Sequence, residues 1–239
     1  METFLLWIGV IGFVAATAYF VLLGTRTPPG KRIFHVITAV ITGVAAFSYL
    51  MMATGAGATM VDGGRLFYYF RYIDWVITTP LLLLDLALLG LASPRRNAGF
   101  IAGLIGLDLF MILTGLLAGS RSSGFGRGFW FIVSTVALVA LLYLVVTRLF
   151  SEAAGQPEAV YQIFRTLAYL TAVLWAFYPI VWLIGTEGFG AVNSTVEVLL
   201  FLILDFLAKI GFGLLLLTNR EALDQVGGSA QPSRRRRVV

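Results

Sequence analysis

The sequence predicts an all-α membrane protein that folds as a bundle of seven transmembrane helices. Two observations favour this class. Hydrophobic residues make up 59% of the 239 residues and charged residues only 12%, so the chain has more apolar surface than a soluble domain of this length can bury. The charged residues also gather in short clusters between apolar runs, and seven of these runs reach the length of about 20 residues that crosses a hydrocarbon core.

The seven expected helices follow one another with short connections. The first begins directly after Met1 and Glu2, without the basic segment and small-residue cleavage site of a signal peptide, so we expect a helix that is retained. Clusters of turn-forming residues end each of the first six runs, at residues 27–30, 62–64, 93–96, 120–128, 155–157 and 185–190. The expected helices lie near residues 3–23, 32–54, 68–91, 97–118, 126–148, 160–184 and 193–217. Short connections make consecutive helices antiparallel neighbours in one bundle.

The lysines and arginines predict the orientation in the membrane. One set of connections is rich in them and the other is poor, and the richer set is expected to face the cytoplasm. The richer set holds Arg26, Lys31, Arg32, Arg95, Arg96, Arg148, Arg165, Arg220 and the run 234–237. The poorer set holds Arg65, Arg121 and Arg127, with Arg71 just inside the third helix. With an odd number of spans, the N-terminus is then extracellular and the C-terminus cytoplasmic. This predicts a multi-pass protein of the cell membrane.

The chain is expected to divide into a transmembrane domain, residues 1–219, and a tail, residues 220–239. The tail is basic, polar and glycine-containing, which is typical of a disordered cytoplasmic segment. Its run of arginines indicates a topology anchor, with contact to anionic membrane lipid as the alternative.

Composition excludes several kinds of site. The chain has no cysteine, which rules out disulfides, thiolate catalysis and zinc–thiolate sites. It has a single histidine, His35, so a histidine-based metal site is also excluded and we expect no metal. We expect His35 to be a solvated surface residue near the cytoplasmic end of the second helix, with a role in proton uptake as the alternative. The net charge of +5 does not indicate nucleic-acid binding, because the basic residues are sorted by membrane side.

Ionisable residues inside the expected spans are the strongest functional signal, because each is costly in a bilayer and needs a partner or a function. They are Arg71, Asp74, Asp85, Asp108, Asp205 and Lys209, with Glu197 near a helix end. Lys209 and Asp205 are four residues apart on the last helix and therefore share a face. A lysine amine in this setting is suited to forming a Schiff base with an aldehyde. A purely structural ion pair with Asp205 is the alternative.

The third helix carries a pattern that is typical of a proton relay. Asp74 and Asp85 are 11 residues apart. At roughly 100° and 1.5 Å per residue they return to within about 20° of one another and lie about 16 Å apart along the axis. Two carboxylates at different depths on one face can pass a proton along the membrane normal, with a titratable amine between them in depth.

Aromatic residues on the sixth helix predict a flat ligand. Trp175, Tyr178 and Trp182 recur at spacings of three and four and so form one rigid face. Such residues are usually core, but a continuous aromatic wall suits a planar, conjugated molecule.

Three segments resemble the microbial rhodopsins. Residues 71–85 (RYIDWVITTPLLLLD) resemble the third-helix signature of that family, residues 204–213 (LDFLAKIGFG) its retinal-lysine signature and residues 175–182 (WAFYPIVW) its sixth-helix wall. The resemblance extends over nearly the whole chain and is closest to bacteriorhodopsin-like proton pumps. It implies a seven-helix fold with all-trans retinal as the cofactor.

The resemblance also implies roles for individual residues. Lys209 would carry retinal as a Schiff base. Asp74 would be its counter-ion and first proton acceptor, hydrogen-bonded by Thr78, and Asp205 the second counter-ion. Asp85 would be the cytoplasmic proton donor, kept protonated by burial and by a hydroxyl such as that of Thr38.

Further roles follow from the same resemblance. Glu187 and Glu197, with Arg71, resemble an extracellular proton-release group. Tyr49 and Tyr178 would hold Asp205, and Asp108 resembles a buried, protonated aspartate near the retinal ring. The residues expected to form the retinal pocket are Tyr49, Trp75, Thr79, Leu82, Met111, Gly115, Phe131, Ser134, Thr135, Trp175, Tyr178 and Trp182. Phe131 stands where these pumps often have tryptophan, and a bulky residue there argues against the carotenoid-binding window of some relatives.

The function that the resemblance implies is light-driven outward proton pumping, which is transport and not enzyme catalysis. The expected partners are retinal, protons and membrane lipid, without nucleic acid; relatives often form trimers, so a trimer-like homo-oligomer is one expectation. A photosensory rhodopsin that signals through a transducer is the main alternative, although such receptors commonly lack a carboxylate at the Asp85 position. A chloride pump would lack the Asp74 carboxylate, and a sodium pump would differ at both relay positions. A carrier with a buried Lys–Asp pair and no chromophore would leave the aromatic wall unexplained.

Overall fold

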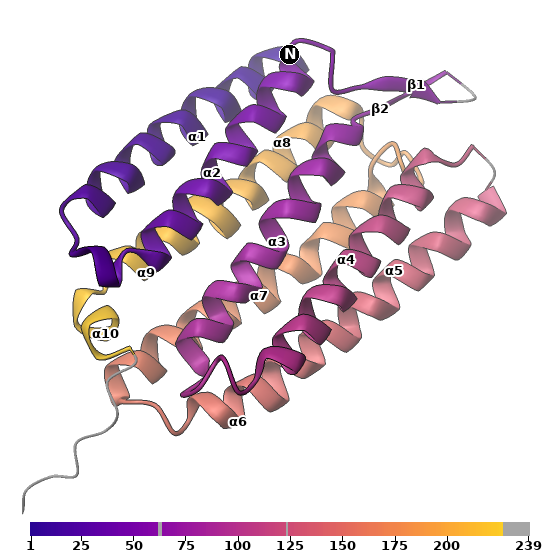
Figure 1. The fold of residues 1–239 in the computed structure, drawn as a ribbon. Coiled ribbons are helices and arrows are strands. Elements are labelled where there is room, and N and C mark those ends of the chain that lie inside the picture. The colour runs from indigo at the N-terminus through magenta and orange to yellow at the C-terminus, as the bar shows by residue number, and fades with distance from the viewer. Residues whose placement is uncertain (62–63, 123, 227–239) are drawn as a thin grey trace, which may run out of the picture.

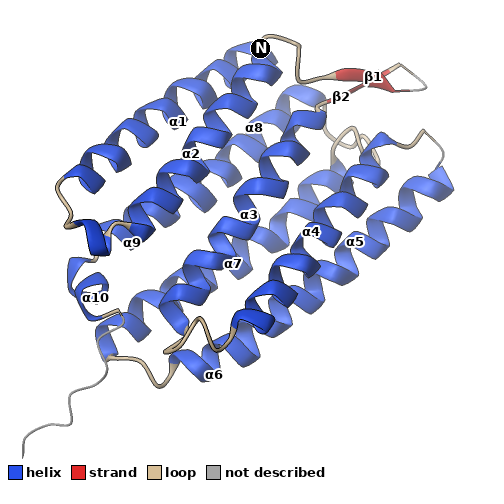
Figure 2. Ribbon diagram, in the orientation of Figure 1, coloured by secondary structure: helices blue, strands red, loops and turns tan. Residues whose placement is uncertain are grey.

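The structure is a computed structural model that describes residues 1–61, 64–122 and 124–226. Its helices lie side by side in one bundle (Figures 1 and 2). In the described chain seven helices are long and apolar enough to cross a membrane, namely Glu2–Thr25, Ile33–Ala53, Tyr69–Gly90, Ala98–Ser120, Gly124–Ala153, Glu158–Ile184 and Ser194–Thr218. The prediction of an all-α, seven-helix membrane protein is therefore confirmed. The predicted bounds differ from these by a few residues at most helix ends.

Two of the seven spans are interrupted by a π-helical segment. The fifth span consists of α5 (Gly124–Leu144), the π-helical Val145–Leu149 and α6 (Phe150–Ala153). The seventh consists of α8 (Ser194–Asp205), the π-helical Phe206–Gly211 and α9 (Phe212–Thr218). The other spans are α1 (Glu2–Thr25), α2 (Ile33–Ala53), α3 (Tyr69–Gly90), α4 (Ala98–Ser120) and α7 (Glu158–Ile184). A π-helical turn often marks a functional position, and the second one contains Lys209.

The spans differ in how deeply they are buried. In its most apolar stretch, α3 has 61% of its residues buried and the fifth span only 22%. Thus α3 lies in the interior of the bundle, whereas α5 presents large apolar side chains such as Val136, Val139 and Tyr143 outward, as a helix facing lipid does. The residues expected to carry chemistry on α3 are consequently all inside the bundle.

The two ends of the bundle have different structures. At the first, which we call the hairpin end, α2 and α3 are joined by the antiparallel strands β1 (Thr59–Val61) and β2 (Arg65–Phe67). The N-terminus lies at this end (Figure 1). The sequence predicted only a turn here, because each strand is three residues long and too short to show an alternating pattern.

At the other end, which we call the α10 end, the short helix α10 (Arg220–Gln225) follows the last span. A 3₁₀ turn, Pro29–Lys31, joins α1 and α2 there. Lys31 Nζ lies 2.6 Å from Asp224 Oδ1, and Ala222 is fully buried. Residues 220–225 are therefore packed against the bundle, although the sequence predicted that the tail begins at residue 220. Residues 227–239 of the predicted tail lie outside the described residues.

The prediction for His35 was wrong. The residue is only 6% exposed, and its Nε2 lies 3.3 Å from the hydroxyl of Thr27. Gly24 on α1 explains the burial, because it has no side chain and a Cβ there would lie 3.2 Å from the His35 Cβ. The close approach of two helices at a glycine cannot be read from the apolar pattern of either helix alone.

Candidate functional site

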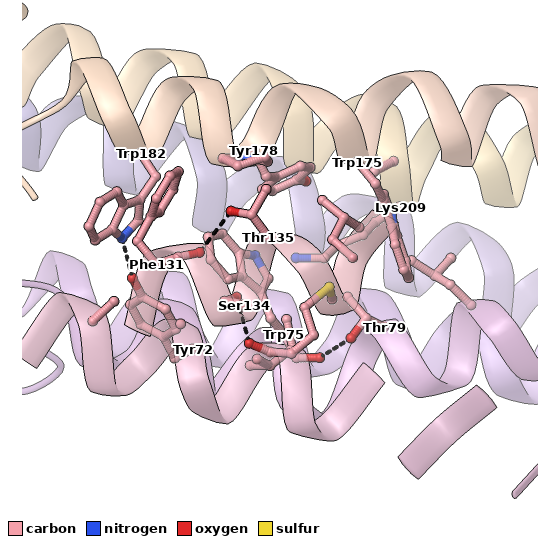
Figure 3. Close-up of a pocket in the computed structure, with 18 residues that line it drawn as sticks. Tyr72, Trp75, Thr79, Phe131, Ser134, Thr135, Trp175, Tyr178, Trp182 and Lys209 are labelled. Carbon is pink, nitrogen blue, oxygen red and sulfur yellow. Dashed lines mark hydrogen bonds between the residues drawn. The ribbon is translucent and has the colours of Figure 1, made fainter. Parts of the chain in front are cut away.

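A pocket runs through the middle of the bundle between α3, α4, α5, α7 and the seventh span (Figure 3). Its wall consists of Tyr72, Trp75, Thr79, Leu82, Met111, Ile112, Gly115, Ala118, Phe131, Ser134, Thr135, Leu138, Trp175, Tyr178, Pro179, Trp182, Ala208 and Lys209. Eleven of the twelve residues predicted to form the pocket with Lys209 are in this wall. The twelfth, Tyr49, is not among the wall residues, and its hydroxyl donates to Asp205 instead.

Six wall residues were not predicted: Tyr72, Ile112, Ala118, Leu138, Pro179 and Ala208. Two of these could have been found, because Tyr72 directly follows Arg71 in the third-helix motif and Ala208 directly precedes Lys209. The others are ordinary apolar residues, and only the packing of the helices decides which of them face the pocket.

Lys209 is buried at the pocket with two carboxylates. Its amine points into the pocket (Figure 3), it is 2% exposed, and it donates hydrogen bonds to Asp74 Oδ2 and, over 3.0 Å, to Asp205 Oδ1. Its Nζ also lies 5.7 Å from the centroid of the Phe13 ring. With a carboxylate on each side, the positive charge of the buried amine stays compensated even when one of the two carboxylates becomes neutral.

Asp205 is held from three other sides. The hydroxyls of Tyr49 and Tyr178 each donate to it over 2.9 Å, and Trp75 Nε1 donates over 3.4 Å. The two tyrosine contacts are those that the resemblance implied. Gly9 on α1 makes room for Tyr49, because a Cβ at Gly9 would lie 2.1 Å from that ring. Asp205 is therefore held by donors from α2, α3 and α7 as well as by Lys209.

Asp74 is held more loosely. Its Oδ2 contacts Lys209, but its Oδ1 is buried and has no hydrogen-bond partner among residues 1–61, 64–122 and 124–226. Thr78 was predicted to bond to this carboxylate, and its side chain does interact with it. The Thr78 hydroxyl also donates to the main-chain carbonyl oxygen of Asp74 over 2.9 Å, the bond that a threonine one helical turn later commonly makes. Of the two carboxylates beside the lysine, Asp74 has fewer hydrogen-bond donors than Asp205.

The walls of the pocket are flat and mostly apolar. Phe131 stacks on Trp182 with a centroid distance of 4.6 Å and an interplanar angle of 17°, and both lie at the opposite end of the pocket from Trp175 (Figure 3). At Gly115 the wall is tightly packed, since a Cβ there would lie 3.2 Å from Ser134 Oγ. An elongated aromatic slot with a reactive amine on one wall fits retinal, an apolar polyene aldehyde.

Asp108 lies beside the pocket and is fully buried. Thr79 donates to its Oδ2 over 2.8 Å and also to the main-chain oxygen of Trp75 over 2.7 Å. This links α4 to α3 at the wall of the pocket, as expected of a structural residue.

At the hairpin end, Arg71 joins two glutamates. Its Nη1 lies 3.3 Å from Glu197 Oε1 and 3.8 Å from Glu187 Oε1, and its guanidinium lies 4.1 Å from the centroid of the Phe201 ring. Glu197 Oε2 also accepts from the main-chain N–H and the hydroxyl of Thr186, over 2.6 and 2.7 Å. The three residues that the sequence analysis grouped as a release site are therefore brought together.

Glu187 is the second glutamate beside Arg71. It is 2% exposed, and the Tyr72 hydroxyl donates to its Oε2 over 2.6 Å. Burial raises the pKa of Glu187, the positive charge of Arg71 opposes that effect, and the neighbouring Glu197 raises the pKa further. The pKa of Glu187 therefore depends on the position of Arg71.

Toward the α10 end, Asp85 is alone. It is 0% exposed, and neither of its carboxylate oxygens has a hydrogen-bond partner within the described chain. The expected bond from Thr38 is absent there, and the Thr38 hydroxyl, also buried, has no partner either. Thr38 instead packs its methyl group against α9, where a Cβ on Gly213 would lie 2.5 Å from it. A buried carboxyl without donors favours its neutral, protonated form.

Comparison with known proteins gives consistent matches over the whole site. The family model described as bacteriorhodopsin-like protein matches residues 1–223. Bacteriorhodopsin of Haloterrigena sp. (strain arg-4) is 46% identical over 230 residues, which cover 94% of this chain and 90% of that protein.

Two solved structures extend the comparison to the fold. The crystal structure of thermophilic rhodopsin from Rubrobacter xylanophilus superposes with a TM-score of 0.94 at 62% identity and covers 96% of this chain and 100% of that one. That of a light-driven proton pump, LR (Mac), from Leptosphaeria maculans superposes with a TM-score of 0.86 at 34% identity, with coverages of 94% and 96%.

Proposed function

The chain belongs to the bacteriorhodopsin-like protein family, and from this premise we propose that it is a light-driven pump that carries protons out of the cell, with all-trans retinal joined to Lys209 as a Schiff base. Its seven apolar helices and its family make it a multi-pass protein of the plasma membrane. The observation that carries the proposal is the set of buried ionisable groups at three depths. Asp85 lies toward the α10 end, Lys209 with its two aspartates in the middle, and Arg71 with its two glutamates at the hairpin end.

The proposed direction follows from the charges at the two ends. The α10 end carries Arg26, Lys31, Arg32, Arg95, Arg96, Arg148, Arg165 and Arg220, whereas the hairpin end carries Arg65, Arg121 and Arg127. By the positive-inside rule the α10 end faces the cytoplasm. Asp85 then lies on the cytoplasmic side of Lys209 and the glutamates on the extracellular side.

When bound, retinal supplies light absorption and a photoisomerisation that changes the direction of the N–H bond at the lysine nitrogen. Asp74 Oδ2, which contacts that nitrogen, is the proposed first acceptor of the proton. Asp205 is saturated with donors from Tyr49, Tyr178 and Trp75, so it is proposed to stay charged and to serve as the fixed counter-ion.

Protonation of Asp74 removes a negative charge one helical turn from Arg71. The guanidinium is then attracted mainly by Glu187 and Glu197, which it already contacts. A stronger interaction with Arg71 stabilises the charged form of Glu187, so a proton is released at the extracellular side. The proton leaves from the glutamate pair and not from Asp74 itself.

Asp85 is the proposed donor that restores the proton at the lysine nitrogen from the cytoplasmic side. Without a hydrogen-bond partner in the described residues it keeps its proton until water or a helix movement reaches it. Pro179 inside α7 removes one main-chain hydrogen bond from that helix and is a suitable point for such a movement. Outward transport requires that the lysine nitrogen become accessible from the cytoplasmic side after the proton has left toward the extracellular side.

The test is a light-induced pH measurement. Cells that make the protein with retinal supplied should acidify an unbuffered medium on illumination, and a protonophore should abolish the signal. A visible absorption band should form with retinal and bleach with hydroxylamine in the light. Lys209→Ala should give no band, whereas Lys31→Ala should give the normal one. A coloured protein that does not change the pH would instead support the photosensory alternative, which the buried Asp85 disfavours.

A further inference from the structure

The β1–β2 hairpin is fastened to the end of α4 by one arginine. Arg65 lies on β2, where it pairs with Val61, and its Nη2 donates to the main-chain oxygen of Gly119. Its guanidinium lies 5.7 Å from the centroid of the Phe67 ring. A cation at the C-terminal end of a helix interacts favourably with the carbonyl groups there. Arg65 thus fixes the position of the hairpin relative to α4.

Gly119, to which Arg65 is bonded, packs against Tyr72, the side chain that binds Glu187. A Cβ on Gly119 would lie 2.6 Å from Phe67 Cε2 and 2.8 Å from the hydroxyl oxygen of Tyr72. The rings of Phe67 and Tyr72 are 5.6 Å apart, and the Tyr72 hydroxyl donates to Glu187. Continuous contacts therefore connect Arg65 with the carboxylate of Glu187.

Arg65 also contributes charge. The charged and titratable groups around Glu187 come from four elements. Arg71 and Tyr72 belong to α3 and Glu197 to α8. Arg127 of α5 donates from its Nη1 to the Glu187 main-chain oxygen over 3.0 Å, and Arg65 belongs to β2. The Nη1 of Arg65 is buried and has no hydrogen-bond partner in the part of the chain that the structure describes. The positive charge of Arg65 acts with that of Arg71 against the burial that raises the pKa of Glu187.

We propose that Arg65 is a positioning residue for proton release, which fixes the hairpin against α4 and holds a second positive charge beside Glu187. Nothing in the sequence pattern singled it out, since it stood only among the few basic residues of the poorer set of connections. The inference rests on the proposed function, because it concerns the pH at which the proposed release group gives up its proton.

The experiment compares Arg65→Gln with Arg65→Lys and with Arg121→Gln, which removes an equal charge from an exposed residue at the same end. A pH-sensitive dye follows proton release after a flash at a series of pH values. In Arg65→Gln the midpoint for prompt release should move to higher pH by about 0.5–1 unit, as expected for one charge near a partly screened carboxylate. Arg65→Lys should largely restore the midpoint, and Arg121→Gln should leave it unchanged. The visible band reports whether each variant is folded.

A second readout does not depend on pumping. The infrared carboxyl band of Glu187, identified by its loss in Glu187→Gln, is titrated in the dark in membranes with and without retinal. The same upward shift in Arg65→Gln is expected in both. If Arg65→Gln titrates like Arg121→Gln, or if Arg65→Lys fails to restore the midpoint, the inference is wrong. If the wild-type protein shows no light-induced acidification but the infrared shift is present, the proposed function fails, while the effect of Arg65 on the Glu187 carboxyl stands.

Discussion

Lys209 and Asp74 are in direct hydrogen-bonding contact although 135 residues separate them in the chain. The other carboxylate at this amine, Asp205, is only four residues away on the same span. The two acids therefore belong to different helices, and they differ in how firmly they are held. Asp205 accepts three further donors, whereas Asp74 has one oxygen without a partner in the described structure. This asymmetry supports the proposal that Asp74 is the carboxylate that takes up the proton.

Replacing Asp74 by asparagine should abolish pumping and shift the visible band to longer wavelength. Asparagine cannot take up a proton as a carboxylate does, and the loss of a negative charge beside the lysine nitrogen favours the more delocalised excited state of a cationic chromophore. Light-induced pH change and absorption spectra measure both effects. Asp108→Asn is the control, because Asp108 is bonded to Thr79 and not to Lys209. Outward pumping by Asp74→Asn at more than about one tenth of the wild-type rate would contradict the assignment.

Replacing Asp85 by asparagine should leave the first proton transfer intact and slow the recovery of the dark state. The lysine nitrogen then has no internal donor on the α10 side, so it must wait for a proton from the cytoplasm. A decrease of about 10²-fold in the recovery rate is expected from the loss of a general acid. Flash absorption spectroscopy measures the recovery.

Thr38→Val is the matched control for Asp85, because the two side chains share no hydrogen bond in the described structure. Its effect on recovery should be much smaller than that of Asp85→Asn. Equal rates of dark-state recovery in Asp85→Asn and the wild type would show that Asp85 is not the proton donor.

Much of the fold and of the pocket could be predicted from the sequence. Seven apolar runs define seven spans, and helical spacing puts Asp74 with Asp85, and Asp205 with Lys209, on shared faces. Every pocket residue named from the sequence lies in the wall except Tyr49, which contacts Asp205. These predictions succeeded because each depends on one helix or on a motif whose residues keep their spacing.

Features that depend on two elements meeting could not be predicted. The environments of Thr38 and His35 are set by Gly213 and Gly24 on neighbouring helices. Arg65 comes into contact with α4 only because a three-residue strand turns the chain back toward it. A sequence pattern shows which face of a helix is apolar and does not show how closely two faces approach.

Replacing Arg71 by glutamine should move prompt proton release to higher pH. Burial raises the pKa of Glu187 and Arg71 opposes it, so removing Arg71 leaves the effect of burial with less compensation and the pKa rises. A group with a higher pKa gives up its proton only at higher pH, so the midpoint of prompt release should increase by about 1 unit or more. Dye measurements after a flash at a series of pH values give the midpoint.

Arg71→Lys is the control, since it keeps the positive charge and should shift the midpoint less than Arg71→Gln. A midpoint that stays the same or falls in Arg71→Gln would show that Arg71 does not control release from Glu187.

Replacing Gly119 by alanine should lower the thermal stability and disturb proton release together. The new Cβ would lie 2.6 Å from Phe67 and 2.8 Å from the Tyr72 hydroxyl, closer than atoms pack, so one of these groups must move. Overpacking of this kind costs about 1–3 kcal/mol. It also weakens the bond from Tyr72 to Glu187. Thermal loss of the visible band measures the first effect, and the pH midpoint of prompt release the second.

Gly103 provides the comparison on the same helix, because nothing lies within 4 Å of a Cβ built there. Gly103→Ala should leave release unchanged and make the protein as stable as the wild type or more so, by about 0.5–1 kcal/mol, since alanine favours a helix over glycine. The temperature at which half of the visible band is lost should therefore be lower in Gly119→Ala than in Gly103→Ala. The two variants could instead lose their colour at the same temperature and release protons alike. This result would show that the end of α4 can move to accommodate the new methyl group, and that Gly119 does not couple the hairpin to Glu187.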